Sequence, residues 1–431
     1  MNLKHIKFCR LCGNPHLSEV IDLGCQTIQG FFSYKDKPEP SKRKISTKIV
    51  RCDSQKWENG CGLVQNSVIV PPEILYSNYG YLSSVSVTMT NHLNSLNQKI
   101  QEIKGNLFGE TVCDIGCNDG TFLSFYGPEV KKIGVDPSDV AKSVTGDIKI
   151  ISDCFPSRKL DKYIQDTPDI KVSVFSAFAC LYDVFDIEST LRSIKKNLSN
   201  DGIFVFEVAY LPTVIKNLGF DGMVLEHISL FSLSTLEYAL NKAGLKSFRA
   251  EKTSTNSGSL LVFVCKNDCD VFDTTENLEN LHKLRLEEFD AELDEEKTYE
   301  GFREKVSQLS RDLRTKLCNL KASGKKIHIL GASTKLNTVL SYVDIGPDLI
   351  DCAAERDPRK WGGRLLSGIP MVSEEESRKT VDVYLVGPYH FFREILHREQ
   401  DSILNKNIEL LFPLPKILLI NKDNYSQYAN H

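Results

Sequence analysis

A glycine-containing turn followed by an acid is the part of this chain best suited to bind a ligand. Residues 114–120 read Asp-Ile-Gly-Cys-Asn-Asp-Gly and connect a predicted strand to a helix predicted at 121–123. Gly116 and Gly120 allow the backbone to turn tightly and to approach a ligand closely. Asp136 ends the next predicted strand, where its carboxylate can accept hydrogen bonds from ribose hydroxyls. The spacing favours a nucleotide-binding β-turn-α unit over an ordinary strand-to-helix turn.

Further polar residues stand at the ends of other predicted strands, and ligands of parallel sheets bind at the carboxyl ends of the strands. Asp153 can read an adenine amino group, and Phe155 can cover the adenine ring. Strands are predicted over 111–115, 132–136, 148–151, 172–176, 202–208 and 260–265, with helices between most of them, which indicates a doubly wound parallel sheet. The residues expected around a nucleotide cofactor are Asp114, Gly116, Asn118, Gly120, Asp136, Asp153, Phe155 and Ser176.

Glu226 and His227 are adjacent on a predicted loop ahead of a helix that begins near Ser234. Side chains of these types can supply a general base and an acidic partner for it. A solvated or structural loop histidine is the alternative. The predicted catalytic pair is therefore His227 as the base with Glu226 as the group that orients it or binds a substrate hydroxyl.

Four cysteines near the start of the chain have the types and spacing of metal ligands. Cys9 and Cys12 form a CxxC knuckle, and Cys52 and Cys61 follow about forty residues later. Four thiolates satisfy tetrahedral zinc, and such a site stabilises a small region with few apolar residues of its own. A redox CxxC and unliganded thiols are the alternatives.

A second glycine turn occurs late in the chain, where residues 331–335 follow a predicted strand at 326–330. This turn has one glycine and a lysine, which suits a phosphate or a substrate better than a whole dinucleotide; a purely structural unit is the alternative. A tyrosine- and serine-rich segment at 74–84 is either a lid over a polar ligand or a packed connector. The predicted substrate-binding residues are Tyr76, Tyr79, Tyr81, Asn256, Ser259, Ser333, Lys335 and Arg356.

The composition of the chain excludes several classes of function. The 431 residues suit two or three domains, and the hydrophobic fraction of 41% with a charged fraction of 26% is that of a globular protein. A formal net charge of −4 implies no broad basic surface, so nucleic acid is not an expected partner. We find no N-terminal signal pattern and no apolar run of transmembrane length, so a cytoplasmic protein without membrane contact is expected.

The order of these motifs resembles that of the zinc-containing, S-adenosylmethionine-dependent sugar C-methyltransferases, which modify nucleotide-linked deoxy-keto sugars. The resemblance extends from Cys9 to Pro415 and includes the Asp-Pro-Arg-Lys-Trp-Gly segment at 357–362. It implies an α/β protein with a zinc-binding module (1–75), a class I methyltransferase Rossmann-like domain (76–270), a helical connector (271–323) and a C-terminal Rossmann-like substrate-binding domain (324–431). It also implies that Cys9, Cys12, Cys52 and Cys61 hold zinc and that Asp114, Gly116 and Asp136 contact S-adenosylmethionine.

The chain departs from the family at one loop. The family's catalytic loop reads Tyr-His-Glu-His, whereas residues 224–227 here read Val-Leu-Glu-His. The leading hypothesis is C-methylation of a nucleotide-activated sugar by a monomer or homodimer, through proton removal by His227. The alternatives are a nicotinamide-dependent sugar-nucleotide oxidoreductase and a methyltransferase-like protein with altered or lost activity.

Overall fold

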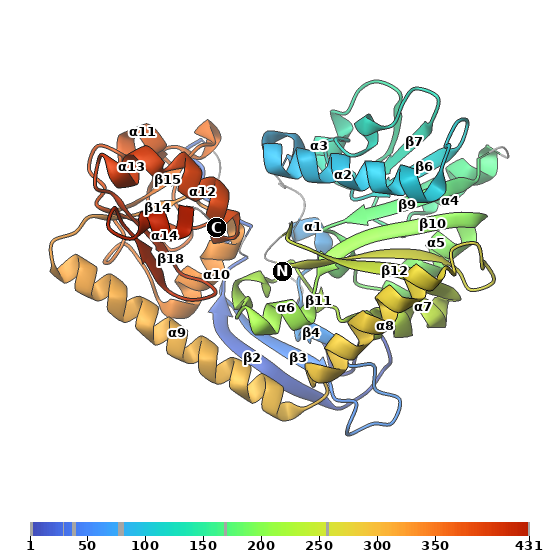
Figure 1. Cartoon of the computed structure of the whole chain (residues 1–431), viewed down its shortest axis with the longest axis horizontal. Helices are drawn as coiled ribbons and strands as arrows, with labels where there is room; N and C mark the ends of the chain where they lie inside the picture. Colours follow the sequence, from blue (N-terminus) through green and yellow to red (C-terminus); the bar gives the residue numbers. More distant parts are fainter. Residues whose placement is uncertain are drawn as a thin grey trace.

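Two α/β lobes face one another, and an N-terminal sheet and a long helix run along their lower side in Figure 1. The computed structural model describes residues 3–28, 30–36, 40–75, 82–167, 170–255 and 258–429. In this part of the chain no helix is long and apolar enough to cross a membrane.

The N-terminal module is built around an antiparallel sheet in the order β11-β4-β3-β2. One face of its strand β3 is buried and the other is partly exposed, which is the period-two pattern of a sheet covered on one side. The edge strand β11 belongs in sequence to the central lobe, so the sheet joins the two parts of the chain. The elements are β1 (Lys4–His5), β2 (Leu17–Gln26), β3 (Ile45–Cys52), β4 (Val64–Asn66), β5 (Val68–Ile69), α1 (Pro72–Leu75) and β11 (Ser229–Leu230).

The central lobe contains a seven-stranded sheet in the order β12-β13-β10-β9-β6-β7-β8. The five strands from β10 to β8 are parallel, and β9, β6 and β7 have buried, mostly apolar runs that suit strands covered on both faces. Its strands are β6 (Thr111–Ile115), β7 (Lys131–Val135), β8 (Ile148–Ile151), β9 (Val172–Phe178), β10 (Leu198–Ala209), β12 (Leu245–Thr253) and β13 (Ser259–Lys266). Its helices are α2 (Val87–Lys104), α3 (Asp139–Lys142), α4 (Arg158–Asp166), α5 (Ile187–Asn197), α6 (Leu211–Lys216), α7 (Leu233–Ala243) and α8 (Thr275–Asp290).

Two expectations about this lobe are wrong. The sheet is not wholly parallel, because β13 runs antiparallel to both β10 and β12. Only a few residues separate β12 from β13, and so short a connection joins antiparallel neighbours. The turn at 114–120 opens no α-helix but a single 3₁₀ turn, η2 (Leu123–Phe125), since Pro128 follows closely and disfavours a longer helix.

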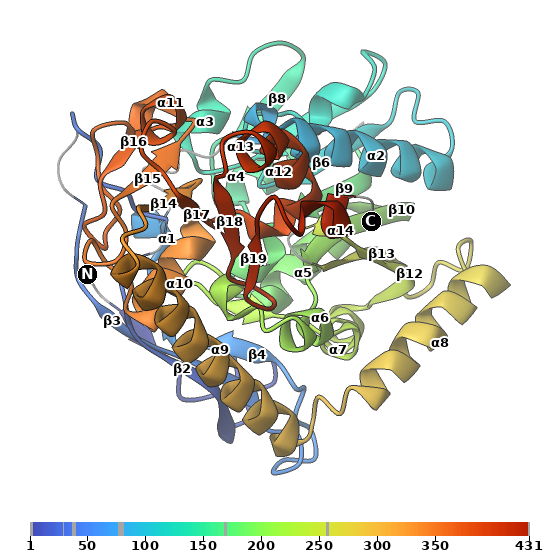
Figure 2. The ribbon, with the colours of Figure 1, turned by 60° about the vertical axis from the view of Figure 1, so that its left-hand side comes forward.

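The C-terminal lobe is a second α/β unit, with a six-stranded sheet in the order β16-β15-β14-β17-β18-β19 (Figure 2). All neighbours are parallel except β18 and β19. Its strands are β14 (Ile327–Leu330), β15 (Cys352–Glu355), β16 (Met371–Ser373), β17 (Val383–Val386), β18 (Glu409–Phe412) and β19 (Leu418–Ile420). Its helices are α10 (Thr334–Val343), α11 (Glu374–Ser377), α12 (Phe392–Arg398), α13 (Gln400–Leu404) and α14 (Tyr425–Ala429).

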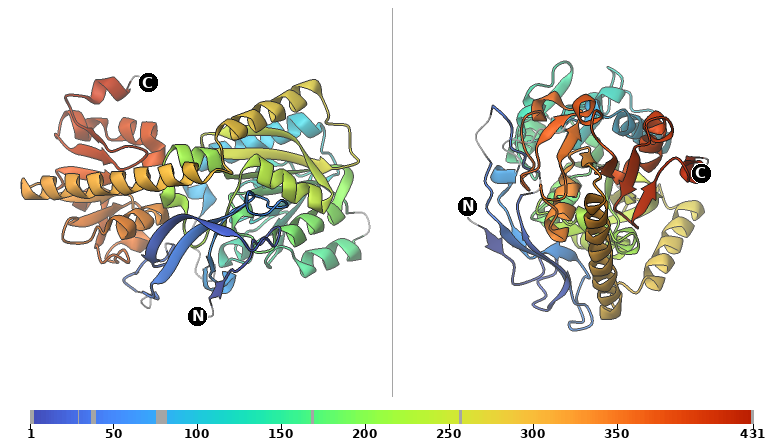
Figure 3. Two further views of the ribbon diagram at one scale, coloured as in Figure 1. Left: turned by 90° about the horizontal axis from the view of Figure 1, so that it is seen from below. Right: turned by 90° about the vertical axis from the view of Figure 1, so that its left-hand side faces the viewer.

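One hydrophobic core joins the N-terminal sheet to the C-terminal lobe. The helix α9 (Glu296–Ala322) runs beside β2 and continues to the C-terminal lobe (Figure 3). Its buried residues recur at helical spacing and pack in one cluster with residues of β2, β3, β14 and β17. The buried residues of α9 are Tyr299, Phe302, Val306, Leu309, Ser310, Leu313 and Leu317. This shared core fixes the position of the C-terminal lobe relative to the N-terminal sheet.

Candidate active site

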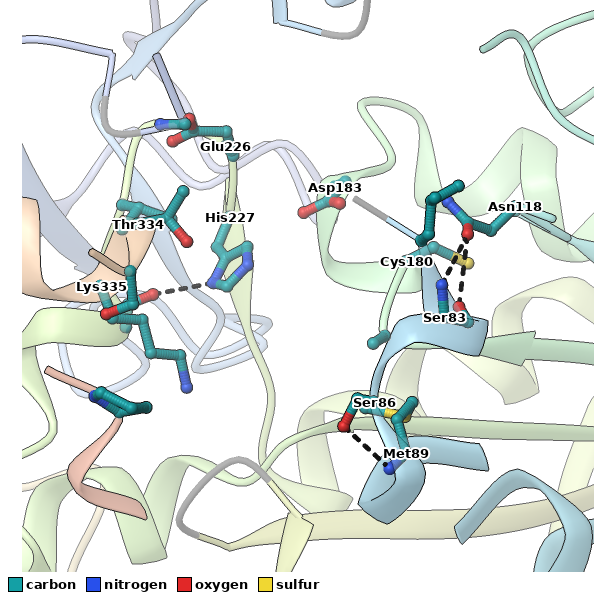
Figure 4. Close-up of a pocket in the computed structure, with 18 of the residues that line it drawn as sticks. Ser83, Ser86, Met89, Asn118, Cys180, Asp183, Glu226, His227, Thr334 and Lys335 are labelled. Atoms are coloured by element: carbon teal, nitrogen blue, oxygen red, sulfur yellow. Dashed lines mark hydrogen bonds between the residues drawn. The ribbon is translucent and has the colours of Figure 1, made fainter. Parts of the chain in front are cut away.

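A single cavity of about 1960 Å³ lies between the two lobes. Its walls include the first glycine turn, the loop of His227 and the second glycine turn. A pocket for one small ligand usually measures about 300–1,000 Å³, so this cavity has room for two ligands side by side. In Figure 4, Lys335 and His227 lie at one end of the pocket, and Asn118 and Cys180 lie at the other.

Asp136 organises the end of the cavity formed by the central sheet. Its Oδ2 accepts a hydrogen bond from the Asn118 amide (2.9 Å), and its Oδ1 accepts one from the Ser138 amide (2.7 Å). Gly116 has a φ of +71°, and a Cβ there would lie 3.0 Å from the Cys180 Sγ. A side chain at this position would be crowded by Cys180, whereas glycine fits the turn and lines the cavity. The predicted cofactor residues that line the cavity are Gly116, Asn118, Asp136, Asp153 and Phe155.

Asp114, Gly120 and Ser176, also predicted to contact the cofactor, lie behind this wall rather than in it. The Ser176 hydroxyl donates to the Asp114 Oδ1 (2.6 Å), and burial raises the pKa of Asp114 to about 7. Gly120 has a φ of +76° and packs against side chains of Val144 and Ile148. These three residues shape the turn from within.

His227 is held by a backbone carbonyl. Its Nδ1 lies 2.9 Å from the Gly222 oxygen, so Nδ1 carries the proton and Nε2 keeps its lone pair. The ring contacts that of Tyr182, with the centroids 4.3 Å apart. Burial, assisted by the nearby charge of Lys335, lowers the pKa of His227 to about 4. The imidazole is therefore neutral at pH 7, which is the state that a general base needs.

Glu226 does not orient His227, contrary to one of the roles predicted for it. Its Oε1 accepts a hydrogen bond from the Gly30 amide (2.6 Å) of the N-terminal module. In Figure 4 the two side chains point in different directions, as expected for adjacent residues on extended chain. Burial raises the pKa of Glu226. Its other predicted role, binding a substrate hydroxyl, stays a prediction.

The second glycine turn forms the opposite end of the cavity. Ser333, Lys335 and Arg356 all line it, as predicted for substrate-binding residues. Ser333 caps α10, since its hydroxyl accepts from the Leu336 amide (3.3 Å). Burial lowers the pKa of Lys335, and the charge of Asp221 partly offsets this effect.

Of the remaining predicted substrate residues, only Ser259 belongs to the described part of the chain, and it does not line the cavity. Ser259 is buried at the start of β13, where its hydroxyl donates to the Thr255 carbonyl (3.0 Å). Tyr76, Tyr79, Tyr81 and Asn256 lie outside the described residues.

A histidine–carboxylate pair, His92 with Glu207, lines the same cavity and was not predicted as part of the site. The His92 Nε2 lies 2.8 Å from the Glu207 Oε2, and the Thr253 hydroxyl donates to the Glu207 Oε1 (2.6 Å). The sequence places Glu207 at a strand end, which is a signal for the site. It gives no signal for the partner, because 115 residues separate His92 from Glu207.

The four predicted metal ligands come together away from the cavity. The Sγ atoms of Cys9, Cys12, Cys52 and Cys61 all lie within 4.8 Å of one another. The pairs Cys9–Cys61 and Cys12–Cys52 are separated by 3.5 and 3.4 Å. A zinc ion with four Zn–S bonds of about 2.3 Å holds its sulfurs about 3.8 Å apart, so the cluster fits zinc in size and ligand type.

The hydrogen-bond donors around the cysteines also suit a thiolate site. The side-chain amide of Asn14 and the backbone amide of Cys61 each donate to the Cys52 Sγ at 3.3 Å. Such hydrogen bonds stabilise a metal-bound thiolate. The long spacer between the second pair of cysteines is accommodated by a turn that the Gly60 amide closes on the Trp57 carbonyl (2.8 Å).

Comparison with known proteins gives three family matches in sequence order. Residues 9–76 match a zinc binding domain, residues 91–248 a methyltransferase domain, and residues 254–415 a C-methyltransferase C-terminal domain. The C-methyltransferase NovU of Streptomyces niveus is 25% identical over 430 residues, covering 98% of this chain and 99% of NovU.

Solved structures resemble part of the chain. The magnesium protoporphyrin IX methyltransferase of Synechocystis PCC 6803 with bound S-adenosylmethionine has 13% identity and a TM-score of 0.32, covering 42% of this chain and 80% of that one. The Bacillus YcgJ protein has 14% identity and a TM-score of 0.33, covering 42% of this chain and 100% of that one. TM-scores this low carry no weight for the function.

Proposed function

We propose that the substrate of this chain is a nucleotide-linked keto sugar, which the chain methylates at the carbon beside the ketone. The chain belongs to the zinc-containing, S-adenosylmethionine-dependent C-methyltransferases. The observation that carries the proposal is the cavity itself. It joins the turn at Gly116, the neutral His227 and the second turn at Lys335 in one space large enough for a donor and an acceptor.

The residues of the cavity supply what this reaction needs. Bound S-adenosylmethionine supplies an electrophilic methyl group on its sulfonium. The Nε2 of His227 takes the proton from the carbon beside the acceptor's ketone, and the electron pair left behind forms the new bond to the methyl group while the S–CH₃ bond breaks. S-adenosylhomocysteine leaves, and the protonated His227 releases its proton to solvent, because its pKa of about 4 leaves it neutral at pH 7.

The acceptor's nucleotide is assigned to the C-terminal end of the cavity. Lys335 and Arg356 are cationic, and Ser333 stands at the N-terminus of a ten-residue helix, α10. Positive side chains and a helix N-terminus suit a diphosphate. Glu226 is assigned to a hydroxyl of the sugar, because its Oε2 is buried and has no hydrogen-bond partner among the described residues.

A methyltransferase-like protein with lost turnover is the second candidate, favoured by one observation. Val224 and Leu225, which replace the family's tyrosine and first histidine, are 3% and 0% exposed, and Leu225 packs in an apolar cluster with Ile28 and Val68. An oxidoreductase has no comparable support, since Gly331 is the only glycine of the second turn and the matched families are methyltransferases.

The test is methyl transfer to a panel of nucleotide-linked keto sugars, with methyl-labelled S-adenosylmethionine as the donor. We expect label in a product whose new C–CH₃ bond is found by NMR. Product methylated at oxygen would overturn the assigned acceptor atom. Tight donor binding without transfer to any member of the panel would favour the inactive alternative.

A further inference from the structure

The loop that carries His227 is held mainly by the N-terminal module. Directly after it, β11 pairs with β4, with Ser229 opposite Gln65. Asn66 of β4 donates its backbone amide to the Ile228 carbonyl (3.1 Å) and its side-chain amide to the carbonyls of Val224 (2.9 Å) and His227 (3.4 Å). The base therefore depends for its position on a strand that follows the last zinc ligand by only a few residues.

Arg10, inside the zinc knuckle, reaches the same loop. Its guanidinium donates to the Ile228 carbonyl (2.8 Å) and to the Ser229 hydroxyl. It also donates to the carbonyls of Val184 (3.3 Å) and Phe185 (2.9 Å). These last two residues follow Tyr182, whose ring lies against that of His227. One side chain thus ties together the two loops that enclose the imidazole.

The backbone of Arg10 is fixed by the metal cluster. Its neighbours Cys9 and Cys12 are two of the four ligands, and the Arg10 amide donates to the Gln65 Oε1 (3.2 Å). A hydrogen bond from the Gly13 amide to the Cys9 carbonyl (2.9 Å) closes the knuckle. A change in metal occupancy therefore acts directly on the backbone from which the Arg10 side chain extends.

We propose that the zinc knuckle positions the general base, with Arg10 as the positioning residue that couples the metal cluster to the loops of His227 and Tyr182. The inference rests on the proposed function in its use of His227 as the base. Its structural part, the coupling of Arg10 to the loops, does not depend on the identity of the acceptor. Lysine cannot replace arginine here, since a single ammonium cannot reach acceptors in two loops at once.

The test compares Arg10→Lys with Arg51→Lys. Arg51 is a buried arginine of the same module, adjacent to the ligand Cys52, but its guanidinium contacts Asp294 and Glu296 near the start of α9 instead of the His227 loop. For each variant, zinc content, hydrogen exchange of the peptide 224–231, and kcat and KM are measured.

We expect both variants to keep zinc. In Arg10→Lys, the peptide 224–231 should exchange at least tenfold faster and kcat should fall at least tenfold, with the KM for S-adenosylmethionine changed less than twofold. Arg51→Lys should alter neither the exchange of this peptide nor kcat. If Arg10→Lys folds poorly, Asn66→Ala takes its place in the test. Asn66→Ala removes the side-chain contacts to Val224 and His227, so it should give the same faster exchange and the same lower kcat.

Exchange of peptide 224–231 that stays at the wild-type rate in Arg10→Lys and Asn66→Ala would overturn the inference, whatever the activity. Equal acceleration in Arg51→Lys would overturn it too, since the effect would then belong to general loosening of the module. If only the proposed function is wrong, the wild-type chain transfers no methyl group, but peptide 224–231 still exchanges faster in Arg10→Lys than in the wild-type chain.

Discussion

At the residue scale, a backbone carbonyl and a nearby charge set the tautomer and the basicity of His227. The Gly222 oxygen fixes the tautomer of His227, a task that a carboxylate performs in many other sites. A neutral acceptor raises the basicity of an imidazole less than a carboxylate does. Together with burial and the charge of Lys335, this leaves the pKa of His227 at about 4.

The first prediction concerns His227 and pH. A lowered pKa keeps the imidazole neutral to lower pH, so kcat/KM should stay level on the acid side until about pH 4 instead of falling near 6.5. His227→Ala should reduce kcat by roughly 10²–10⁴-fold, the usual cost of losing a general base. Calorimetry should show unchanged S-adenosylmethionine affinity. A variant within a few-fold of wild type would shift the role to His92, which lines the same cavity.

Asp136 gives the second prediction. Asp136→Ala removes the carboxylate predicted to accept the ribose hydroxyls and also frees the amides of Asn118 and Ser138, so the turn itself should loosen. Losing one charge-assisted hydrogen bond costs about 1.5–3 kcal/mol, so S-adenosylmethionine affinity should fall at least tenfold. Calorimetry measures this loss. The control is Asp139→Ala, three residues away on the surface in a pair with Lys142, which should bind as wild type does.

At the element scale, the sequence predicts best what is local. Neighbouring residue types are enough to predict the CxxC knuckle, the glycine turns and the strand-end acids. In the structure, each of the two glycine turns follows a strand, as predicted. The pairing of β4 with β11 joins residues far apart in the chain, and neither strand has a pattern that names its partner. The sequence also predicts Glu226 as the group that orients His227, whereas the structure gives this role to the Gly222 carbonyl, because a backbone carbonyl has no signature in the residue types.

Zinc gives the third prediction, at the scale of the module. Purified protein should contain one zinc per chain, and Cys12→Ser should lose it. Because metal binding contributes to folding, the melting temperature of Cys12→Ser should fall by at least about 5 °C. Cys25→Ser is the matched control, since Cys25 is exposed and outside the cluster. Full metal content in Cys12→Ser, measured by elemental analysis, would exclude this set of ligands.

At the scale of the whole molecule, the site is assembled from parts that could not act alone. The turn at 114–120 belongs to the central sheet, the N-terminal module holds the loop of His227, and Lys335 comes from the C-terminal lobe. The core that α9 shares with β2 and β14 fixes the positions of these parts relative to one another. The charge of Lys335 therefore reaches a base on another lobe.

The last prediction measures that influence across the cleft. Lys335→Met removes a positive charge near His227, so the pKa of His227 should rise from about 4 toward 6.5. The acid limb of kcat/KM should move to higher pH in the same direction. Acceptor KM should also rise, because a cation that faces the nucleotide's diphosphate is lost, whereas S-adenosylmethionine affinity should not change. Lys196→Met is the control: its ammonium pairs with Asp161 outside the cavity, so the acid limb should stay in place. An unmoved limb in Lys335→Met would show that burial alone sets the basicity of His227, and an unmoved acceptor KM would place the diphosphate away from α10.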